Sequence, residues 1–209
     1  FRIASQTKAI VSTGIMILHE RGALDISHPL ERYIPEWENM QVAVSNDNGG
    51  YSLEPSRSPI TLRNLLTHTG GMSYGSGPAA DKWEEAGFQG WYFADRNEPV
   101  GDTIARMASL PLDEHPGERW IYGYNTDILG AVIEKASGMD LNSFLKQEIF
   151  EPLGMIDTHF YLPEEKKGRL ATVYRPKASG GIEARHETNG MQSQGMYDTG
   201  PRVSFSGGA

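Results

Sequence analysis

Residues 5–22, SQTKAIVSTGIMILHERG, contain the most apolar run of the chain. The length of this run and the glycine that closes it, Gly22, predict an α-helix over about residues 5–20. Apolar residues fall on every side of the predicted helix. We therefore expect the helix to be buried rather than to lie on the surface.

The first turn of this helix carries a candidate reactive pair. Ser5 and Lys8 are three residues apart and therefore share a face. The positive end of the helix dipole and burial both favour an uncharged amine over a cation. An uncharged lysine beside a serine hydroxyl is a general base beside a nucleophile. The helix N-terminus would also stabilise negative charge that develops near Ser5.

The same spacing has a structural interpretation. Ser5 could cap the helix while Lys8 extends to water. A second S-x-x-K match, Ser143-Phe144-Leu145-Lys146, lies in an amphipathic stretch, and there we favour the structural interpretation. Spacing alone therefore leaves Ser5 and Lys8 as one candidate among several.

Composition narrows the class of protein. The chain of 209 residues is long enough for one good core or a core plus a subdomain. A net charge of -8 argues against a nucleic-acid or anionic-membrane partner. No stretch approaches the ~20 apolar residues of a membrane span. The absence of cysteine excludes disulfides, thiolate catalysis and cysteine zinc sites.

Histidine spacing and the chain ends add two further expectations. None of the six histidines has the dense spacing of a metal site, so we expect no catalytic metal and no cofactor. The chain starts without Met and stops at Ser206-Gly207-Gly208-Ala209. We expect both termini to be truncated. The compartment and the oligomeric state stay open.

Hydrophobic periodicity, prolines, glycines and helix-capping residues predict the other helices and loops. Short helices are expected near 30–33, ending at Pro35, and after Thr61, which is the expected N-cap of residues 62–66. Longer helices are expected over 102–110, 127–137 and 142–150. Residues 44–58 and 70–80 are expected to be loops, and the chain after Pro152 to be irregular, with strand-like pieces such as 158–161. An aromatic cluster indicates core or a pocket wall: Trp83, Phe88, Trp91, Tyr92 and Phe93.

A G-x-S-x-G match and a lone histidine are weaker candidates. Residues 71–75, GMSYG, fit the nucleophile elbow around Ser73, but that elbow needs a strand before it and a helix after it. Here a helix-like stretch precedes the match and a loop follows it, so we expect a glycine-rich loop. His68 is expected to be structural.

Two tyrosines precede the predicted helix at 127–137. Tyr122 or Tyr124 could simply pack, or could shuttle a proton if a nearby cation such as Lys8 stabilised the phenolate. Lys8 and the tyrosine would then titrate as a coupled pair. The amide of Asn125 could orient Lys8 or a substrate carbonyl.

Several segments together resemble the serine β-lactamase and penicillin-binding-protein-like superfamily, closest to the family VIII carboxylesterases. The resemblance runs the full chain through residues 1–8, 24–29, 65–72, 116–122, 127–130, 149–155 and 206–209. It implies that Ser5 is acylated, that Lys8 is the base or its helper, and that Tyr122 relays protons.

The chain departs from the family pattern in places. Tyr124 stands where the family's Y-x-N motif has Asn, and Asn125 is one position late, so Tyr124 stays an alternative relay. Gln6 replaces a more usual hydrophobic residue. The family's third motif, a K-T-G, H-x-G or W-x-G strand, would lie beyond Ala209. Residues 68–70, HTG, match a different segment.

The resemblance implies a mixed α/β (α+β) serine β-lactamase-like fold, of which this chain holds mostly the helical region and little of the antiparallel sheet. We expect a single partial domain over 1–209, with a nucleophile helix at about 5–20, a helical region at about 60–155 and an irregular segment at about 156–209. The expected activity is hydrolysis of a small-molecule ester or amide, with short-chain esters first. The alternatives are a β-lactamase or D-amino-acid peptidase, a non-catalytic penicillin-binding homologue, and a helical domain without chemistry.

Overall fold

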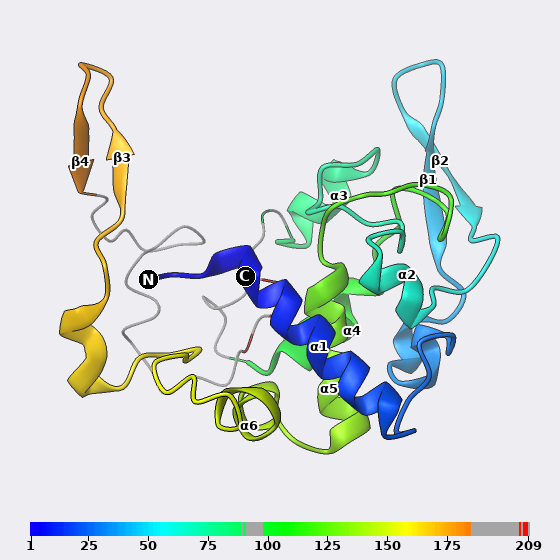
Figure 1. The fold of residues 1–209 in the computed structure, drawn as a ribbon. Helices are drawn as coiled ribbons and strands as arrows, with labels where there is room; N and C mark the ends of the chain where they lie inside the picture. Colours follow the sequence, from blue (N-terminus) through cyan, green and yellow to red (C-terminus); the bar gives the residue numbers. More distant parts are fainter. Residues whose placement is uncertain (89, 91–97, 185–204, 206, 209) are drawn as a thin grey trace.

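The computed structural model describes all residues except 89, 91–97, 185–204, 206 and 209. Its elements follow the chain in the order drawn in Figure 1: η1 (Ala4–Gln6), α1 (Thr7–Glu20), η2 (Leu30–Arg32), η3 (Pro35–Trp37), β1 (Gln41–Ser45), β2 (Tyr51–Pro55), α2 (Leu62–Leu66), α3 (Ala80–Glu85), α4 (Val100–Met107), α5 (Asn125–Ser137), α6 (Leu141–Leu145), η4 (Lys146–Phe150), η5 (Glu164–Arg169), β3 (Tyr174–Pro176) and β4 (Ile182–Ala184). The expected combination of many helices with small antiparallel sheets is confirmed.

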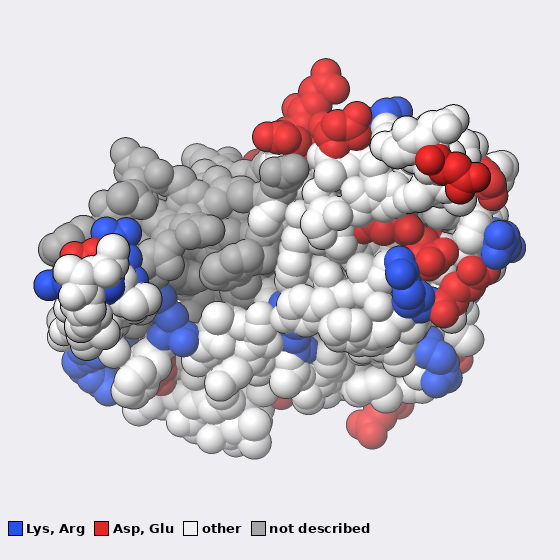
Figure 2. All heavy atoms as spheres, turned by 90° about the horizontal axis from the view of Figure 1, so that it is seen from above, with Lys and Arg blue, Asp and Glu red and all other residues white. Residues whose placement is uncertain are grey.

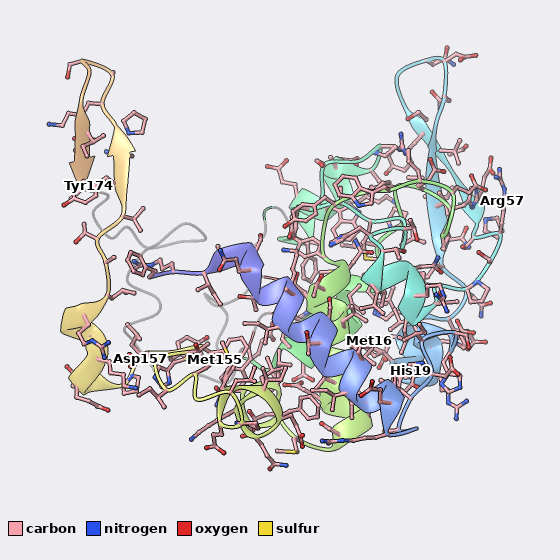
Figure 3. The ribbon with its side chains drawn as sticks, in the orientation of Figure 1. Met16, His19, Arg57, Met155, Asp157 and Tyr174 are labelled. Carbon is pink, nitrogen blue, oxygen red and sulfur yellow. The ribbon has the colours of Figure 1, made fainter. Side chains whose placement is uncertain are left out.

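The predicted nucleophile helix forms as α1, preceded by the 3₁₀ turn η1, which contains Ser5. Gly22 lies just past its end with φ +70°, as expected for a helix-terminating glycine. The expected burial on every side is wrong. Val11 and Ile15 are fully buried, whereas Met16 is 39% exposed on α1 (Figure 3). No neighbouring helix covers Met16 among the described residues, so an apolar side chain remains on the outer face.

The helix α5 is the centre of the core. Residues 125–133 are all buried, and α5 packs against α1, α2, α4 and α6. The helix begins two residues before the predicted 127 and ends at Gly138, which adopts the left-handed conformation at φ 72°. Apolar side chains from these helices form one contiguous core, so α5 fixes the position of the loop that leads into it.

Residues 44–58 are mostly exposed, as predicted, but the prediction of a loop is wrong for the parts that form strands. β1 and β2 pair as an antiparallel hairpin, with Ser45 opposite Tyr51. The Asn46 side chain closes the turn by accepting hydrogen bonds from the N–H groups of Asn48 and Gly50. The other edge of β1 pairs with the backbone of Leu112. Two rows of partners therefore hold a segment whose composition is typical of a loop.

The second sheet also differs from expectation. Residues 158–161 form no strand and run through turns, whereas β3 and β4 pair as a separate antiparallel hairpin. This hairpin stands apart from the helices in Figure 1, and Tyr174 on it is 56% exposed (Figure 3). Among the described residues, none of those in β3 and β4 belongs to the buried core.

The remaining predicted elements form with shifted bounds. Thr61 caps α2 in a capping box with Asn64. The short helix expected near 30–33 forms as the 3₁₀ turn η2. Pro35, expected to end it, begins a second 3₁₀ turn, η3. The helix expected over 102–110 begins earlier, as α4 at Val100, and the one expected over 142–150 is α6 followed by η4, a wider π-type turn. Trp83 and Phe88 are buried, whereas Trp91, Tyr92 and Phe93 lie outside the described residues.

The described surface carries both signs of charge. In the face shown in Figure 2, the charged side chains lie mainly around the outline, and the middle of the described part carries few of them. Within the described residues, no helix combines the length and the hydropathy needed to span a membrane. In the same part of the chain, no three His, Cys, Asp or Glu side chains gather as metal ligands would.

Candidate active site

The Ser5 and Lys8 side chains meet at the start of α1, as their spacing predicts. The Lys8 amine donates a hydrogen bond to the Ser5 hydroxyl oxygen at 3.2 Å. Lys8 is only 9% exposed, and its amine also donates to the backbone carbonyl of Gly208. Ser5 is exposed. The lysine therefore does not extend to water, and the serine hydroxyl is open to a ligand.

The residue before Ser5 has an unusual backbone conformation. Ala4 has φ 43°, a left-handed value that non-glycine residues rarely adopt. Such a residue stores on the order of 1–3 kcal/mol of strain, and strain of this kind gathers at functional sites. The turn brings Ser5 to the front of α1, where its hydroxyl faces the loop that carries Tyr122.

Tyr122 completes a three-residue cluster around the Ser5 oxygen. Its phenol donates a hydrogen bond to Ser5 Oγ at 2.9 Å, and the Lys8 amine lies 4.8 Å from the Tyr122 ring centroid. Partial burial alone would raise the pKa of Tyr122. The hydrogen bonds to Lys8 and Ser5 and the charge of Lys8 outweigh burial, so the pKa lies below the ordinary tyrosine value.

Tyr124 is placed differently from Tyr122. Its side chain is 1% exposed, and its hydroxyl donates to the backbone carbonyl of Gly90. Its ring stacks on Trp83 at 5.8 Å between centroids. The phenol of Tyr122 therefore contacts Ser5, whereas Tyr124 is a core residue. The contacts of Tyr124 do not support its role as the alternative relay.

Asn125 binds the loops around the site rather than Lys8. Its amide nitrogen contacts the His68 ring at 3.2 Å and lies 3.5 Å and 3.3 Å from the backbone carbonyls of Met72 and Ile121. The side chain is fully buried at the first position of α5. These contacts tie the loop after α2 to the segment that carries Tyr122. The expected role in orienting Lys8 or a substrate does not match these contacts.

Sequence reasoning missed the role of Tyr74. The Tyr74 ring meets Tyr122 edge-on at 5.7 Å, and the Lys8 amine lies 5.9 Å from the Tyr74 centroid. Burial, followed by the charge of Asp127, raises the pKa of Tyr74 far above its ordinary value, so Tyr74 stays a neutral phenol. In the sequence, Tyr74 stands out only as a member of the G-x-S-x-G match at residues 71–75, which does not indicate a contact with Tyr122.

His68 and Trp120 also lie against the Tyr122 ring. The His68 ring is 4.9 Å from Tyr122 and 6.1 Å from Trp120, and Trp120 stacks on Tyr122 at 6.0 Å. Burial, and then the charge of Lys8, lower the pKa of His68, which favours its neutral form. Trp120 and Tyr122 are two residues apart in one loop, whereas His68 comes from the separate loop after α2, so no sequence spacing could reveal that His68 meets them.

Ser73 forms part of a structural loop, as expected. Its N–H donates to Asp113 at 2.7 Å, and its hydroxyl accepts from the N–H of Ser76 at 3.0 Å. The short helix α2, not a strand, precedes it along the chain. The strand-turn-helix of a nucleophile elbow is therefore missing from this described segment.

A segment from the far end of the chain reaches the Ser5–Lys8 pair. The buried carboxylate of Asp127 on α5 accepts a hydrogen bond from the Gly208 N–H at 3.0 Å, while the Gly208 carbonyl accepts from Lys8. Gly207 packs against the backbone of Thr126, where a Cβ would meet the carbonyl oxygen at 2.5 Å. The two glycines therefore let the backbone pass between α5 and Lys8. Ser206 and Ala209 lie outside the described residues.

Comparison with known proteins identifies relatives of known activity. The profile of the Beta-lactamase family matches residues 1–200. Monacolin J acid methylbutanoyltransferase of Aspergillus terreus is 34% identical over 184 residues, which cover 86% of this chain and 43% of that protein. Esterase EstB of Burkholderia gladioli is 33% identical over 178 residues, which cover 83% of this chain and 41% of that protein. The chain spans less than half the length of these curated relatives.

Solved structures agree with these matches. A LovD6 mutant of simvastatin synthase from Aspergillus terreus superimposes with a TM-score of 0.75 at 29% identity, covering 99% of this chain and 47% of the other. EstCE1, a hydrolase with promiscuous acyltransferase activity, superimposes with a TM-score of 0.81 over 100% of this chain and 54% of the other. Its 24% identity supports the fold alone. Together with the family match over nearly the whole chain, this shows that the chain belongs to the beta-lactamase family.

Proposed function

We propose that the protein is a serine hydrolase that cleaves carboxylic esters through an acyl-enzyme on Ser5. The observation that carries this proposal is the Ser5 oxygen, which lies within hydrogen-bond reach of both the Lys8 amine and the Tyr122 phenol. A nucleophile beside a base that is itself oriented by a third group is the signature of covalent catalysis. The esterase and acyltransferase relatives support the same reaction class.

Acylation requires the Lys8 amine or the Tyr122 phenolate to accept the proton of the Ser5 hydroxyl. Ser5 Oγ attacks the ester carbonyl carbon and forms the new C–O bond, while its proton passes to the Lys8–Tyr122 pair. The positive end of α1 favours the oxyanion that develops beside Ser5. When the bond to the alcohol oxygen breaks, the pair returns the proton to that oxygen. Water then attacks the acyl-enzyme, and the same proton transfers run in the opposite order.

The surroundings of Lys8 suit this proton exchange. The amine is nearly buried beside the Tyr122 and Tyr74 rings, where solvent screens its charge little. The charge of Lys8 and its hydrogen bond are among the causes that hold the pKa of Tyr122 below its ordinary value. Tyr74, which stays neutral, packs against Tyr122 and restricts its ring.

Acyl transfer to a second alcohol is the other candidate, and the relatives favour it. Two of them are described as a methylbutanoyltransferase and a simvastatin synthase. The chemistry differs from hydrolysis only in the group that releases the acyl chain, because an alcohol takes the place of water. The Ser5, Lys8 and Tyr122 roles are the same in both reactions.

Labelling with a fluorophosphonate probe tests the nucleophile in the protein purified at its native length. We expect Ser5→Ala to abolish labelling. Ser143→Ala is the matched control, because Ser143 belongs to the second S-x-x-K match and donates its hydroxyl to Asp140 on the surface. Labelling that persists in Ser5→Ala and maps to Ser73 would refute the proposal. Turnover of p-nitrophenyl butyrate, against stable acylation by a fluorescent penicillin, separates a hydrolase from a penicillin-binding homologue.

A further inference from the structure

Trp120 is a large apolar side chain left open beside the reactive cluster. It is 63% exposed, although tryptophan is mostly buried in folded proteins. Its ring stacks nearly parallel to Tyr122, with 23° between the planes, and therefore lies directly against the phenol that donates to Ser5. An open aromatic surface at this place is available to a ligand held at Ser5.

The backbone around Trp120 is fixed rather than free. The N–H of Ile121 donates to the His68 carbonyl at 2.8 Å, and the His68 ring lies against Trp120. The charged neighbour Arg119 pairs with Glu114 at 3.5 Å. The backbone hydrogen bond and the ring contacts with His68 and Tyr122 position Trp120 beside the cluster, and the charge of Arg119 is directed to Glu114.

Proton transfer decides which part of a substrate lies beside this ring. In the mechanism proposed above, the Lys8–Tyr122 pair protonates the alcohol oxygen as it leaves, and Tyr122 is the member of the pair that is open to solvent. Proton transfer needs the two oxygens within about 3 Å. The alcohol oxygen of the ester must then lie next to the Tyr122 hydroxyl, and the exposed ring nearest to that position on the same loop is Trp120, which stacks on Tyr122. The acyl part is attached to Ser5 and extends elsewhere.

From this arrangement we propose that Trp120 determines specificity for the alcohol part of the ester and favours alcohols with a flat or bulky apolar substituent. The inference rests on the proposed function and deepens it. Microscopic reversibility places the acceptor alcohol of a transfer reaction in the same position, so Trp120 selects the acceptor as well as the leaving alcohol. Each step only exchanges one C–O bond for another and returns one proton, so no further reactant is needed.

Two ester pairs test the inference by ratios of kcat/KM in the native-length protein. The alcohol pair is 2-phenylethyl butyrate against ethyl butyrate, whose leaving alcohols have similar basicity. The acyl pair is ethyl hexanoate against ethyl butyrate. We expect Trp120→Ala to lower the alcohol ratio about tenfold, the scale of a lost apolar contact in a specificity pocket. The acyl ratio should keep its wild-type value, and Trp120→Phe should restore most of the alcohol ratio.

Active sites are counted by fluorophosphonate labelling of Ser5, and Trp120→Leu replaces the Ala variant if the latter does not fold. An unchanged alcohol ratio would overturn the inference while leaving the hydrolase intact. A fall in the acyl ratio instead would place Trp120 on the wrong side of the scissile bond and overturn it too. A wild-type protein without Ser5-dependent turnover would refute the proposed function itself, and the inference with it.

Discussion

Gly123 offers a sharp test of how packing positions the candidate site. It lies between Tyr122 and Tyr124 and presses on the loop that carries Met72 and Ser73. A Cβ at this position would lie 2.5 Å from the Met72 carbonyl oxygen and 2.6 Å from the Ser73 Cα. Both are backbone atoms, which cannot move aside as a flexible side chain can.

These distances give the size of the expected losses of stability and labelling rate in Gly123→Ala. Unstrained contacts between heavy atoms lie near 3.5–4.0 Å, so Gly123→Ala must separate the two loops by about 1 Å. Overpacking of this kind destabilises a protein by about 1–3 kcal/mol. Each kcal/mol lowers the Tm by about 2–4 °C in a domain of this size. A shift of about 1 Å in a proton-transferring group costs on the order of 100-fold in rate.

Two measurements on the same variant check this prediction: the Tm and the rate of Ser5 labelling by a fluorophosphonate at 25 °C. Gly138→Ala is the matched control, because Gly138 has φ +72° and open space around it at the far end of α5. That change introduces backbone strain of about 1–2 kcal/mol without touching Tyr122. We expect both variants to melt earlier and only Gly123→Ala to label slowly. A folded Gly123→Ala protein that labels at the wild-type rate would refute the argument that this contact positions Tyr122.

Two further predictions concern titrating groups. Because the pKa of Tyr122 is below its ordinary value, Ser5 labelling should rise with pH and level off below the pH at which free tyrosine ionises. Tyr122→Phe should slow labelling about 100-fold or more and remove the rise of the labelling rate with pH. If the rise persists in this variant, it belongs to another titrating group. Burial raises the pKa of Asp113, opposed by hydrogen bonds from Ser73 and by the charge of Arg119. The folded state therefore holds this proton more tightly than the unfolded state, and the resulting stability, present below the unfolded pKa, is lost as pH rises through the folded pKa. In urea unfolding, Asp113→Asn should gain stability relative to wild type across this interval, and a constant difference between the two proteins would contradict the assignment.

Local features of the sequence were sufficient for several elements. The first helix and its end at Gly22, the cap at Thr61 and the end of α5 at Gly138 depend on residues within one or two turns of each other. The contact between Ser5 and Lys8 belongs to this group, because three residues of helix place both side chains on one face whatever the rest of the chain does.

Long-range packing determines which tyrosine hydroxyl lies beside Ser5. The residues alone did not separate Tyr122 from Tyr124, and the family resemblance favoured Tyr122 with Tyr124 as the alternative. In the structure the Tyr122 hydroxyl meets Ser5 and the Tyr124 hydroxyl meets Gly90. The difference arises where Gly123 packs on residues 72–73 and where Asn125 binds the His68 loop.

The hairpin over Gln41–Pro55 has the same origin. Its centre, residues 45–50, is polar and glycine-rich and hid the strands on either side, and the strand pairing is completed by a distant segment at Leu112. The sequence by itself therefore determined the helices and the serine–lysine pair, since these depend on neighbours along the chain. The tertiary structure brought the Tyr122 phenol, 117 residues along the chain, to Ser5 and placed the rings of Tyr74 and His68 beside it, because such long-range contacts depend on how the whole core packs.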